Sequence, residues 1–241
     1  MAYDELHHAL DQAVRWGMIP RNVCDAVTRP GAPRPIMQVL TPTQVSALLE
    51  AAREDRLHAL YVMAITTGLR QGELLGLQWD DVDLTGALLH VRHSLHEVNG
   101  RLSLGEPKTA RAKRPVDLPR IAVAALREHR ERMLAEGHPH GWVFCDTEGG
   151  PVRRPNLLRR SFQPLLKKAG LPQIRFHDLR HTAATLLLLQ GVHPKVVQER
   201  LGHSQISVTL DTYSHVLPSM GREAAAKLDA LLERGTTVAK L

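Results

Sequence analysis

The chain has 241 residues, of which 43% are hydrophobic and only 4% aromatic, so a sizeable core is expected and must consist mainly of aliphatic side chains. Such a core favours packed helices over a sandwich of aromatic-rich strands. The 31 lysines and arginines outnumber the 25 acidic residues and give a net charge of +6, which favours nucleic acid as a partner but also fits a merely basic surface.

Three other classes of protein are disfavoured. Cys24 and Cys145 stand alone in the sequence, which argues against a disulfide framework and against a cysteine zinc site. The longest apolar run, residues 186–189, is far below the roughly 20 residues that span a bilayer. Because the N-terminus also lacks the pattern of a secretory signal, we expect a cytoplasmic protein with no membrane contact.

The first 35 residues read as a short helical piece followed by a linker. Apolar residues at helical spacing predict a first helix that breaks near Gly17 and Pro20. This piece is too small to bury a core alone. Residues 29–35, RPGAPRP, are typical of an extended linker, so a domain boundary is predicted near residue 35.

The next predicted elements are two helices. Thr41, Pro42 and Gln44 match an N-cap, a first-turn proline and a capping-box partner, which predicts a helix start. A second helix is expected from about His58 to Thr67. Gly68 ends it.

Residues 87–118 change to a strand pattern. Apolar residues flank Asn99-Gly100, the strongest short hairpin signal, and residues 115–118 suggest a further strand. We therefore expect a small three-stranded antiparallel sheet. The remainder is predicted to be helical near 120–136, 156–169, 177–190, 194–201, 207–216 and 219–234, which gives a mainly α fold of the α+β type.

One basic motif, His177-Asp178-Leu179-Arg180-His181, contains imidazole and guanidinium side chains that could take part in catalysis. A helix would place residues 177, 180 and 181 on one face. Alone, such a cluster is usually a solvated helix face. Three further segments make the pattern specific: Thr67-Gly68-Leu69-Arg70-Gln71-Gly72-Glu73, Leu201-Gly202-His203 and Thr212-Tyr213-Ser214-His215.

These segments, together with Glu106-Pro107-Lys108-Thr109, closely resemble the phage integrase family of tyrosine recombinases in order and rough spacing, from about Thr41 to Pro218. Residues 9–30 are similar to the last helix and exit of that family's core-binding domain. The resemblance implies a C-terminal remnant of the core-binding domain with its linker over residues 1–35, and a catalytic domain with the tyrosine recombinase fold over residues 36–241.

The resemblance also implies a set of roles. Arg70, Arg180 and His203 would hold the scissile phosphate, and Tyr213 would be the nucleophile. The residue types suit this task, because guanidinium forks and an imidazole can donate hydrogen bonds to the charged oxygens of a phosphodiester transition state. A phenol is a poor nucleophile with a reference pKa of about 10, so it needs an acceptor for its proton. His177 is the matching candidate.

Two further residues complete the predicted site. Lys108 matches the general acid that protonates the departing 5′ hydroxyl, with Lys113 as the nearby competitor. Glu73 lies three residues after Arg70, so on a helix its carboxylate could hold the guanidinium in position. The histidines near the N-terminus show no convincing metal-site spacing. No metal or other cofactor is expected.

The implied activity is site-specific DNA recombination through a 3′-phosphotyrosine, with four protomers on two double-stranded DNA sites and accessory DNA-bending proteins left open. In the family a C-terminal segment docks on the neighbouring protomer. Residues 219–234 suit either that role or packing on their own domain.

Three alternatives stay open. The first is a topoisomerase-like or resolvase strand transferase, which uses the same covalent intermediate. The second is a truncated DNA-binding protein that is inactive alone, although every matching catalytic position is filled. The third is a metal-dependent nuclease, which would need clustered carboxylates; Asp80, Asp81 and Asp83 cluster but lie outside the basic motifs.

Overall fold

The computed structural model describes residues 2–29, 37–106, 113–138, 140–213 and 228–229. The chain divides into two compact units, Met1–Ile36 and Met37–Leu241. Among the described residues, no helix combines the length and the apolar character needed to cross a bilayer.

The first unit is a small pair of helical segments held together by polar contacts. It contains α1 (Ala2–Arg15) and the short 3-10 helix η1 (Val23–Ala26). No residue of α1 is buried. The Asn22 side chain donates to the His7 carbonyl at 3.0 Å and accepts from the Cys24 amide at 2.9 Å, and the Tyr3 hydroxyl donates to the Cys24 carbonyl at 2.8 Å. The helix break near Gly17 is confirmed.

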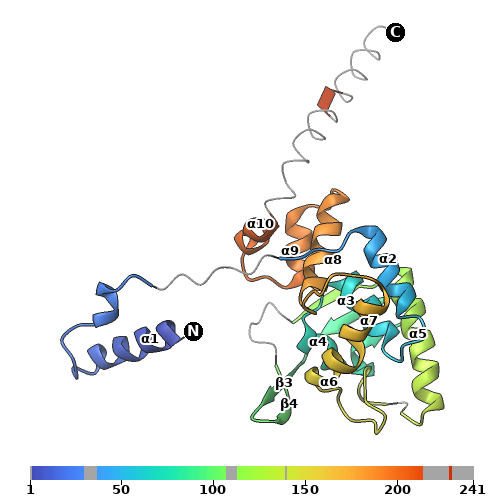
Figure 1. Ribbon diagram of the computed structural model, residues 1–241, viewed down its shortest axis with the longest axis horizontal. Helices are drawn as coiled ribbons and strands as arrows, with labels where there is room; N and C mark the ends of the chain where they lie inside the picture. Colours follow the sequence, from blue (N-terminus) through green and yellow to red (C-terminus); the bar gives the residue numbers. More distant parts are fainter. Residues whose placement is uncertain (1, 30–36, 107–112, 139, 214–227, 230–241) are drawn as a thin grey trace. The chain divides into compact units, whose positions relative to one another are not determined.

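The second unit is built around one largely buried helix, α3 (His58–Thr67), whose predicted bounds are confirmed. Ala59 through Ile65 are all buried, as expected for a helix that is apolar on every side. α3 packs against α2 (Pro42–Ala51), α5 (Arg120–Ala135) and α8 (Asp178–Leu189) (Figure 1). The capping box predicted at Thr41 is present, because its hydroxyl accepts from the Gln44 amide and Gln44 accepts from the Thr41 amide.

Gly68 ends α3 in the left-handed conformation, with φ of 65°. A Cβ at this position would lie 2.5 Å from Cδ2 of Leu201 and 3.5 Å from Cβ of Ala183. The glycine therefore lets the chain turn sharply while the helices around it stay in close contact. The turn is followed directly by Leu69 and Arg70.

We expect Gly68→Ala to lower the free energy of unfolding by about 2–5 kcal/mol, because it adds the left-handed backbone penalty to overpacking against Leu201. Gly170→Ala is the matched control: Gly170 also has positive φ, 63°, but a Cβ placed there would meet no atom within 4 Å. That variant should lose only about 1–2 kcal/mol. Denaturant unfolding of both variants measures the difference, and equal losses would contradict the packing argument.

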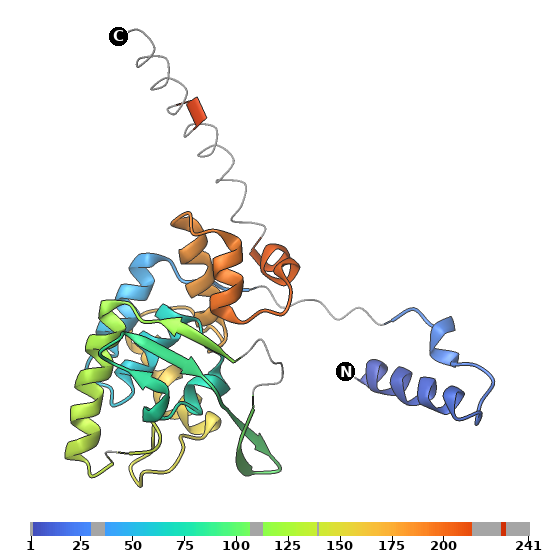
Figure 2. The same ribbon diagram turned by 180° about the vertical axis from the view of Figure 1, so that it is seen from behind.

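Within the described residues, the strands form two small antiparallel sheets (Figure 2). The first has the order β1 (Val82–Asp83), β2 (Leu88–Val91), β5 (Arg114–Asp117), with Leu89 opposite Val82 and Val116. The second is a hairpin of β3 (Ser94–Val98) and β4 (Arg101–Gly105) that projects from the domain. Its turn is Asn99-Gly100, both at positive φ as that dipeptide predicts. A three-stranded sheet is thus present, but the predicted hairpin forms a sheet of its own.

The remaining elements are helical. They are α4 (Gln71–Leu75), the 3-10 helix η2 (Trp79–Asp81), α6 (Arg154–Asn156), the π-helical η4 (Leu157–Phe162), α7 (Gln163–Lys168), α9 (Pro194–Leu201) and α10 (Ile206–Tyr213). The helix expected over 156–169 is present as α6, η4 and α7 in succession. Its π segment ends two residues before Pro164, which has no N–H to donate to an α-helical hydrogen bond. The helix expected at 219–234 lies almost entirely outside the described residues.

A second, smaller apolar cluster joins α8 to α9. Ala184 and Leu188 of α8 pack with Val197 and Leu201 of α9, and all four are buried. Each large aliphatic side chain buried there contributes roughly 1.5–3 kcal/mol. This cluster places the C-terminal end of α9 beside the start of α8, where two of the sequence motifs meet.

Candidate active site

Arg70 lies in the short turn between α3 and α4, and Glu73 fixes it there. Glu73, in the first turn of α4, accepts from the Arg70 backbone amide at 2.9 Å and from Nη1 of the Arg70 guanidinium at 2.8 Å. The Glu73 side chain is 2% exposed, whereas that of Arg70 is 40% exposed. The expected contact between these two residues is present, with Arg70 just before the helix rather than within it.

The charge state of Glu73 is set by its neighbours. Burial alone would raise the pKa of Glu73, but the positive charge and hydrogen bonds of Arg114, followed by those of Arg70, lower it below the ordinary value. Glu73 is therefore an anion at neutral pH, enclosed by two guanidinium groups.

Arg180, on the first turns of α8, is only 3% exposed. Its Nη1 donates to the Gly68 carbonyl at 2.7 Å and its Nη2 to the Leu201 carbonyl at 2.8 Å. These contacts tie the turn after α3 to the end of α9. Arg70 also reaches this end, since its Nη2 donates to the Gly202 carbonyl at 3.2 Å. Arg70 and Arg180, which are 110 residues apart in the sequence, are thus brought together at the C-terminal end of α9.

His203 follows directly after that terminus. Its Nδ1 lies 2.8 Å from the Thr209 hydroxyl oxygen, and its carbonyl accepts from the Gln198 side chain at 3.0 Å. Partial burial and the charges of Arg180 and Arg70 lower the pKa of His203 to about 3. His203 is therefore neutral at pH 7, and its ring can donate from only one nitrogen.

We expect the fully buried Thr209 hydroxyl to donate to Nδ1 and so favour the tautomer of His203 that carries its proton on Nε2. Thr209→Val keeps the shape but removes a hydrogen bond worth about 1 kcal/mol, which should shift the tautomer ratio about fivefold. Nitrogen NMR shifts of the His203 ring measure this ratio. Thr209→Ser should retain the wild-type ratio. An unchanged ratio in the valine variant would show that Thr209 does not select the tautomer.

His177 stands at the N-terminal end of α8 with an exposed side chain. Its ring meets the ring of His181 edge to face, with centroids 4.9 Å apart. Desolvation by neighbouring protein atoms, then the charges of His181 and Arg180, lower the pKa of His177 to about 4. At neutral pH His177 can therefore accept a proton.

Two predicted site residues, Tyr213 and Lys108, are described only in part or not at all. Tyr213 is the last residue of α10, a helix that packs against α9, but its side chain is not among those described. Lys108 lies within residues 107–112, outside the described residues. Lys113, its competitor, pairs with Glu106 at 2.6 Å across the base of that segment.

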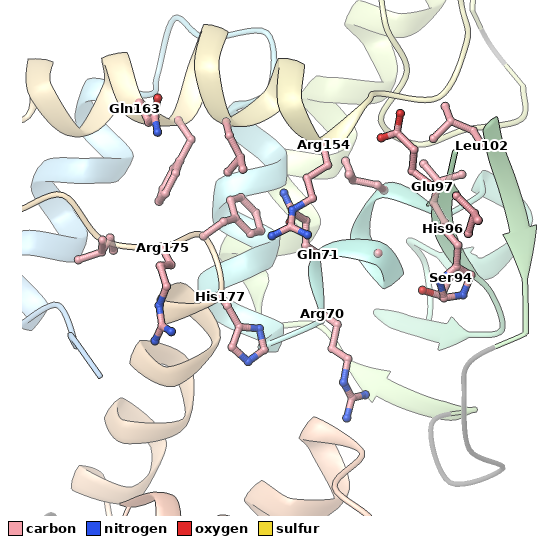
Figure 3. A pocket seen from close by; sticks show the side chains of 18 residues that line it. Arg70, Gln71, Ser94, His96, Glu97, Leu102, Arg154, Gln163, Arg175 and His177 are labelled. Carbon is pink, nitrogen blue, oxygen red and sulfur yellow. The ribbon is translucent and has the colours of Figure 1, made fainter. Parts of the chain in front are cut away.

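A pocket of about 830 Å³ adjoins the site and is bordered by α4, the β3–β4 hairpin and η4. Figure 3 shows the side chains of Arg70, His177 and Arg175 pointing to the same side at one end of this pocket, with Arg154 extending toward them from α6. The polar and charged lining residues include Arg70, Gln71, His96, Glu97, Arg154, Arg175 and His177. A basic, open groove therefore continues from the arginines toward the hairpin.

Sequence reasoning missed Arg114. It ends the basic stretch 108–114, in which only Lys108 and Lys113 were considered as site residues, yet its side chain is 6% exposed and pairs with Glu73 at 3.1 Å. The available signal was its place at the start of the strand at residues 114–117, where alternation turns its side chain inward with Val116.

One group of metal-type side chains lies close together among the described residues: His7, His8 and Asp11 in the first unit. His7 is already engaged by Asp25 at 2.9 Å and by Asp11 at 3.3 Å. These contacts connect α1 to η1, so we assign the group a structural role.

The chain is similar to known proteins in both sequence and structure. Residues 38–220 match the Phage integrase family. The chain is 35% identical to a XerC-like tyrosine recombinase of Caldanaerobacter subterraneus over 91% of its own length and 62% of the relative's. It is 32% identical to the ICEBs1 integrase of Bacillus subtilis, covering 94% of this chain and 64% of that protein. The chain thus spans less than two thirds of the length of these relatives.

Solved structures share the fold. The Tn1549 transposon integrase bound to a circular intermediate DNA superimposes with a TM-score of 0.75 at 25% identity, covering 94% of this chain and 78% of that one. The XerA recombinase gives a TM-score of 0.65 at 26% identity, covering 81% and 66%. The helical domain with its small antiparallel sheets is therefore the tyrosine recombinase catalytic fold, and the chain belongs to the phage integrase family.

Proposed function

We propose that this protein recombines double-stranded DNA at specific sites, in integration or excision, by cleaving and rejoining strands through a 3′-phosphotyrosine at Tyr213. The observation that carries the proposal is the meeting of Arg70, Arg180 and the His203 segment at the C-terminal end of α9. The relatives are recombinases and integrases, and the Tn1549 integrase was solved with DNA.

In the proposed reaction, Arg70 and Arg180 bind the non-bridging oxygens of the scissile phosphate, and His203 donates a further hydrogen bond from Nε2. Paired guanidiniums stabilise the charge that accumulates on those oxygens in the transition state. Glu73 holds the Arg70 guanidinium in place. These contacts supply the electrostatic stabilisation that a metal supplies in other phosphoryl transfers, so we propose that the reaction needs neither metal nor ATP.

Three other residues move protons or form bonds. The Tyr213 oxygen attacks phosphorus while His177, neutral at pH 7, accepts the phenolic proton. Lys108 gives a proton to the departing 5′ oxygen. A 5′ hydroxyl from a second duplex then attacks the phosphotyrosine and passes its proton to Lys108. The phenolate of Tyr213 leaves and takes its proton back from His177, which restores the phosphodiester and both side chains. No water enters and the number of phosphodiester bonds is conserved.

The wider arrangement is also a proposal. Residues 1–35 are the end of a core-binding domain with its linker, and residues 36–241 form the catalytic domain. Four protomers assemble on two DNA sites, and the reaction takes place on nucleoid DNA in the cytoplasm of a bacterial cell or a phage-infected host. Contacts between arginines and phosphates dominate affinity, so binding weakens steeply with salt.

The test is covalent trapping. The protein is incubated in EDTA with a supercoiled plasmid library that carries random inserts, denatured with SDS and digested with protease, and the DNA-linked peptide is sequenced. A nucleotide on the peptide containing Tyr213 supports the proposal. Linkage at another residue, or cleavage only when Mg²⁺ replaces EDTA, would contradict it.

A second assay addresses the topoisomerase-like alternative, which shares the covalent intermediate. Two plasmids of different size and resistance marker are incubated together with the protein. Recombinant plasmids carrying both markers indicate strand exchange, whereas relaxed supercoils without recombinants indicate the topoisomerase-like activity.

A further inference from the structure

Three arginines donate to three consecutive carbonyls at the C-terminal end of α9. Nε of Arg114 donates to the Arg200 carbonyl at 2.7 Å, Nη2 of Arg180 to that of Leu201 at 2.8 Å, and Nη2 of Arg70 to that of Gly202 at 3.2 Å. The last carbonyls of a helix have no intrahelical partner and carry partial negative charge. The end of α9 is therefore a natural place to hold guanidinium groups side by side.

Arg114 differs from the other two because it has no role in the proposed chemistry. It begins β5, opposite Val91 of β2, which fixes its backbone in the sheet. Its side chain is buried and extends from the sheet to the chain segment that leads to His203. A Cβ on Gly202 would lie 2.8 Å from Nη1 of Arg114, so only glycine allows this close approach.

Glu73 connects Arg114 to Arg70. Its Oε2 accepts from Nη2 of Arg114 at 3.1 Å, and its Oε1 accepts from Nη1 of Arg70 at 2.8 Å. Burial opposes the ionised form of Glu73, and the charge of Arg114 is the largest influence that favours it. Without Arg114, only the contacts of Arg70 would oppose the effect of burial, so we expect the pKa of Glu73 to rise above its ordinary value. A neutral carboxyl would hold the Arg70 guanidinium far less firmly than a carboxylate does.

We propose that Arg114 is a positioning residue for strand cleavage. It keeps Glu73 ionised and clamps the end of α9, so that Arg70 and His203 are held where the phosphate binds, and it does not itself contact DNA. This inference rests on the proposed function, because positioning is meaningful only for a reaction at this site.

The first part of the test needs no DNA and compares wild type with Arg114→Met, Glu73→Gln and the double variant. In wild type the lowered pKa of Glu73 means that its contribution to stability is complete above its unfolded pKa and is lost as pH falls below it. In Arg114→Met we expect the pKa of Glu73 to lie above its unfolded value, which reverses the dependence of stability on pH. The free energy of unfolding should therefore fall as pH rises from about 4.5 to 7.5.

The double variant isolates Glu73 from other groups that titrate nearby. Arg70 and Arg114 face Glu73 directly. The charge of Arg114 also acts on Arg200 and His203, and β3, which packs against α4, carries His96 and Glu97. Glu73→Gln should destabilise the wild-type protein but stabilise Arg114→Met at pH 7.5. If the glutamine substitution fails to rescue Arg114→Met, the ion pair is not what Arg114 supplies and the inference is overturned.

The second part measures covalent trapping of the plasmid library against pH, corrected for the folded fraction. Arg114→Met should form the covalent complex about 10–100-fold more slowly, with a rise toward high pH that the double variant lacks. Arg114→Lys retains the charge, so it should keep the wild-type pH profile at a reduced rate. A loss fully explained by unfolding would mean that Arg114 acts on stability alone, which overturns the positioning role.

The two parts also separate the inference from the proposed function. If the wild type forms no covalent complex while Glu73→Gln still rescues the stability of Arg114→Met, the proposed reaction fails and the positioning role fails with it, whereas the ion pair stands. If the wild type reacts and the Arg114 variants react equally well, only the inference fails.

Discussion

Tyr213→Phe should abolish the covalent linkage to DNA while leaving DNA binding nearly unchanged. The substitution removes one hydroxyl oxygen, which is the atom proposed to attack phosphorus, and leaves the arginine contacts to phosphate intact. Because a benzene ring has no nucleophilic atom, the expected loss is complete to within the background of the assay. An SDS-resistant shift of labelled plasmid fragments measures linkage, and filter binding at two salt concentrations measures affinity.

The chain contains only three tyrosines, which makes the control simple. Tyr61 is fully buried, so its hydroxyl cannot reach DNA in the folded protein. The Tyr3 hydroxyl donates a hydrogen bond to the Cys24 carbonyl in the first unit. Tyr3→Phe should therefore form the covalent complex at the wild-type rate. Linkage that persists in Tyr213→Phe would assign the nucleophile to another residue and overturn the mechanism.

Arg180→Lys should reduce covalent complex formation by about a thousandfold even though the positive charge is kept. Losing one preorganised transition-state donor typically costs about a hundredfold to a thousandfold, and lysine cannot reproduce a bidentate fork. Lysine also cannot satisfy the Gly68 and Leu201 carbonyls with the same geometry. A buried acceptor left unpaired costs about 1–3 kcal/mol, so the melting temperature should fall as well.

Arg53→Lys is the matched control for this substitution. Arg53 is 69% exposed and makes only a surface ion pair with Glu50, so its replacement should change neither activity nor stability measurably. Single-turnover rates, corrected for the folded fraction from thermal scans, separate the two effects of Arg180→Lys. A rate loss that vanishes after this correction would show that Arg180 is structural rather than part of the phosphate site.

Local sequence signals predicted the elements whose stability is decided by neighbouring residues. The capping box at Thr41 and the Asn99-Gly100 turn depend on contacts within a few residues, and both are present. The helix from His58 to Thr67 is also present; its apolar run predicted it, although packing in the core stabilises it. The family motifs likewise identified Arg70, Arg180 and His203 together, although they are far apart in the chain.

The sheet could not be derived in the same way. β1 is only two residues long, too short for any alternating pattern, and β2 pairs with β5 across the whole hairpin. The hairpin signal at Asn99-Gly100 specifies its own turn but not what its strands pair with. Strand partners are chosen by packing between distant segments, which no local pattern encodes.

What the sequence by itself determined is therefore the helical architecture, the order of the motifs and the types of side chain available to a phosphate. What only the tertiary structure decided is how those side chains are held. Arg114 lies 41 residues from Glu73 and 86 from Arg200, yet it binds both. The physical reason is that the helix-end carbonyls of α9 and the buried Glu73 come within reach of Arg114 only when α9 packs onto α8 and β5. Strand alternation indicates that the Arg114 side chain points inward, but it does not indicate which groups the side chain meets there.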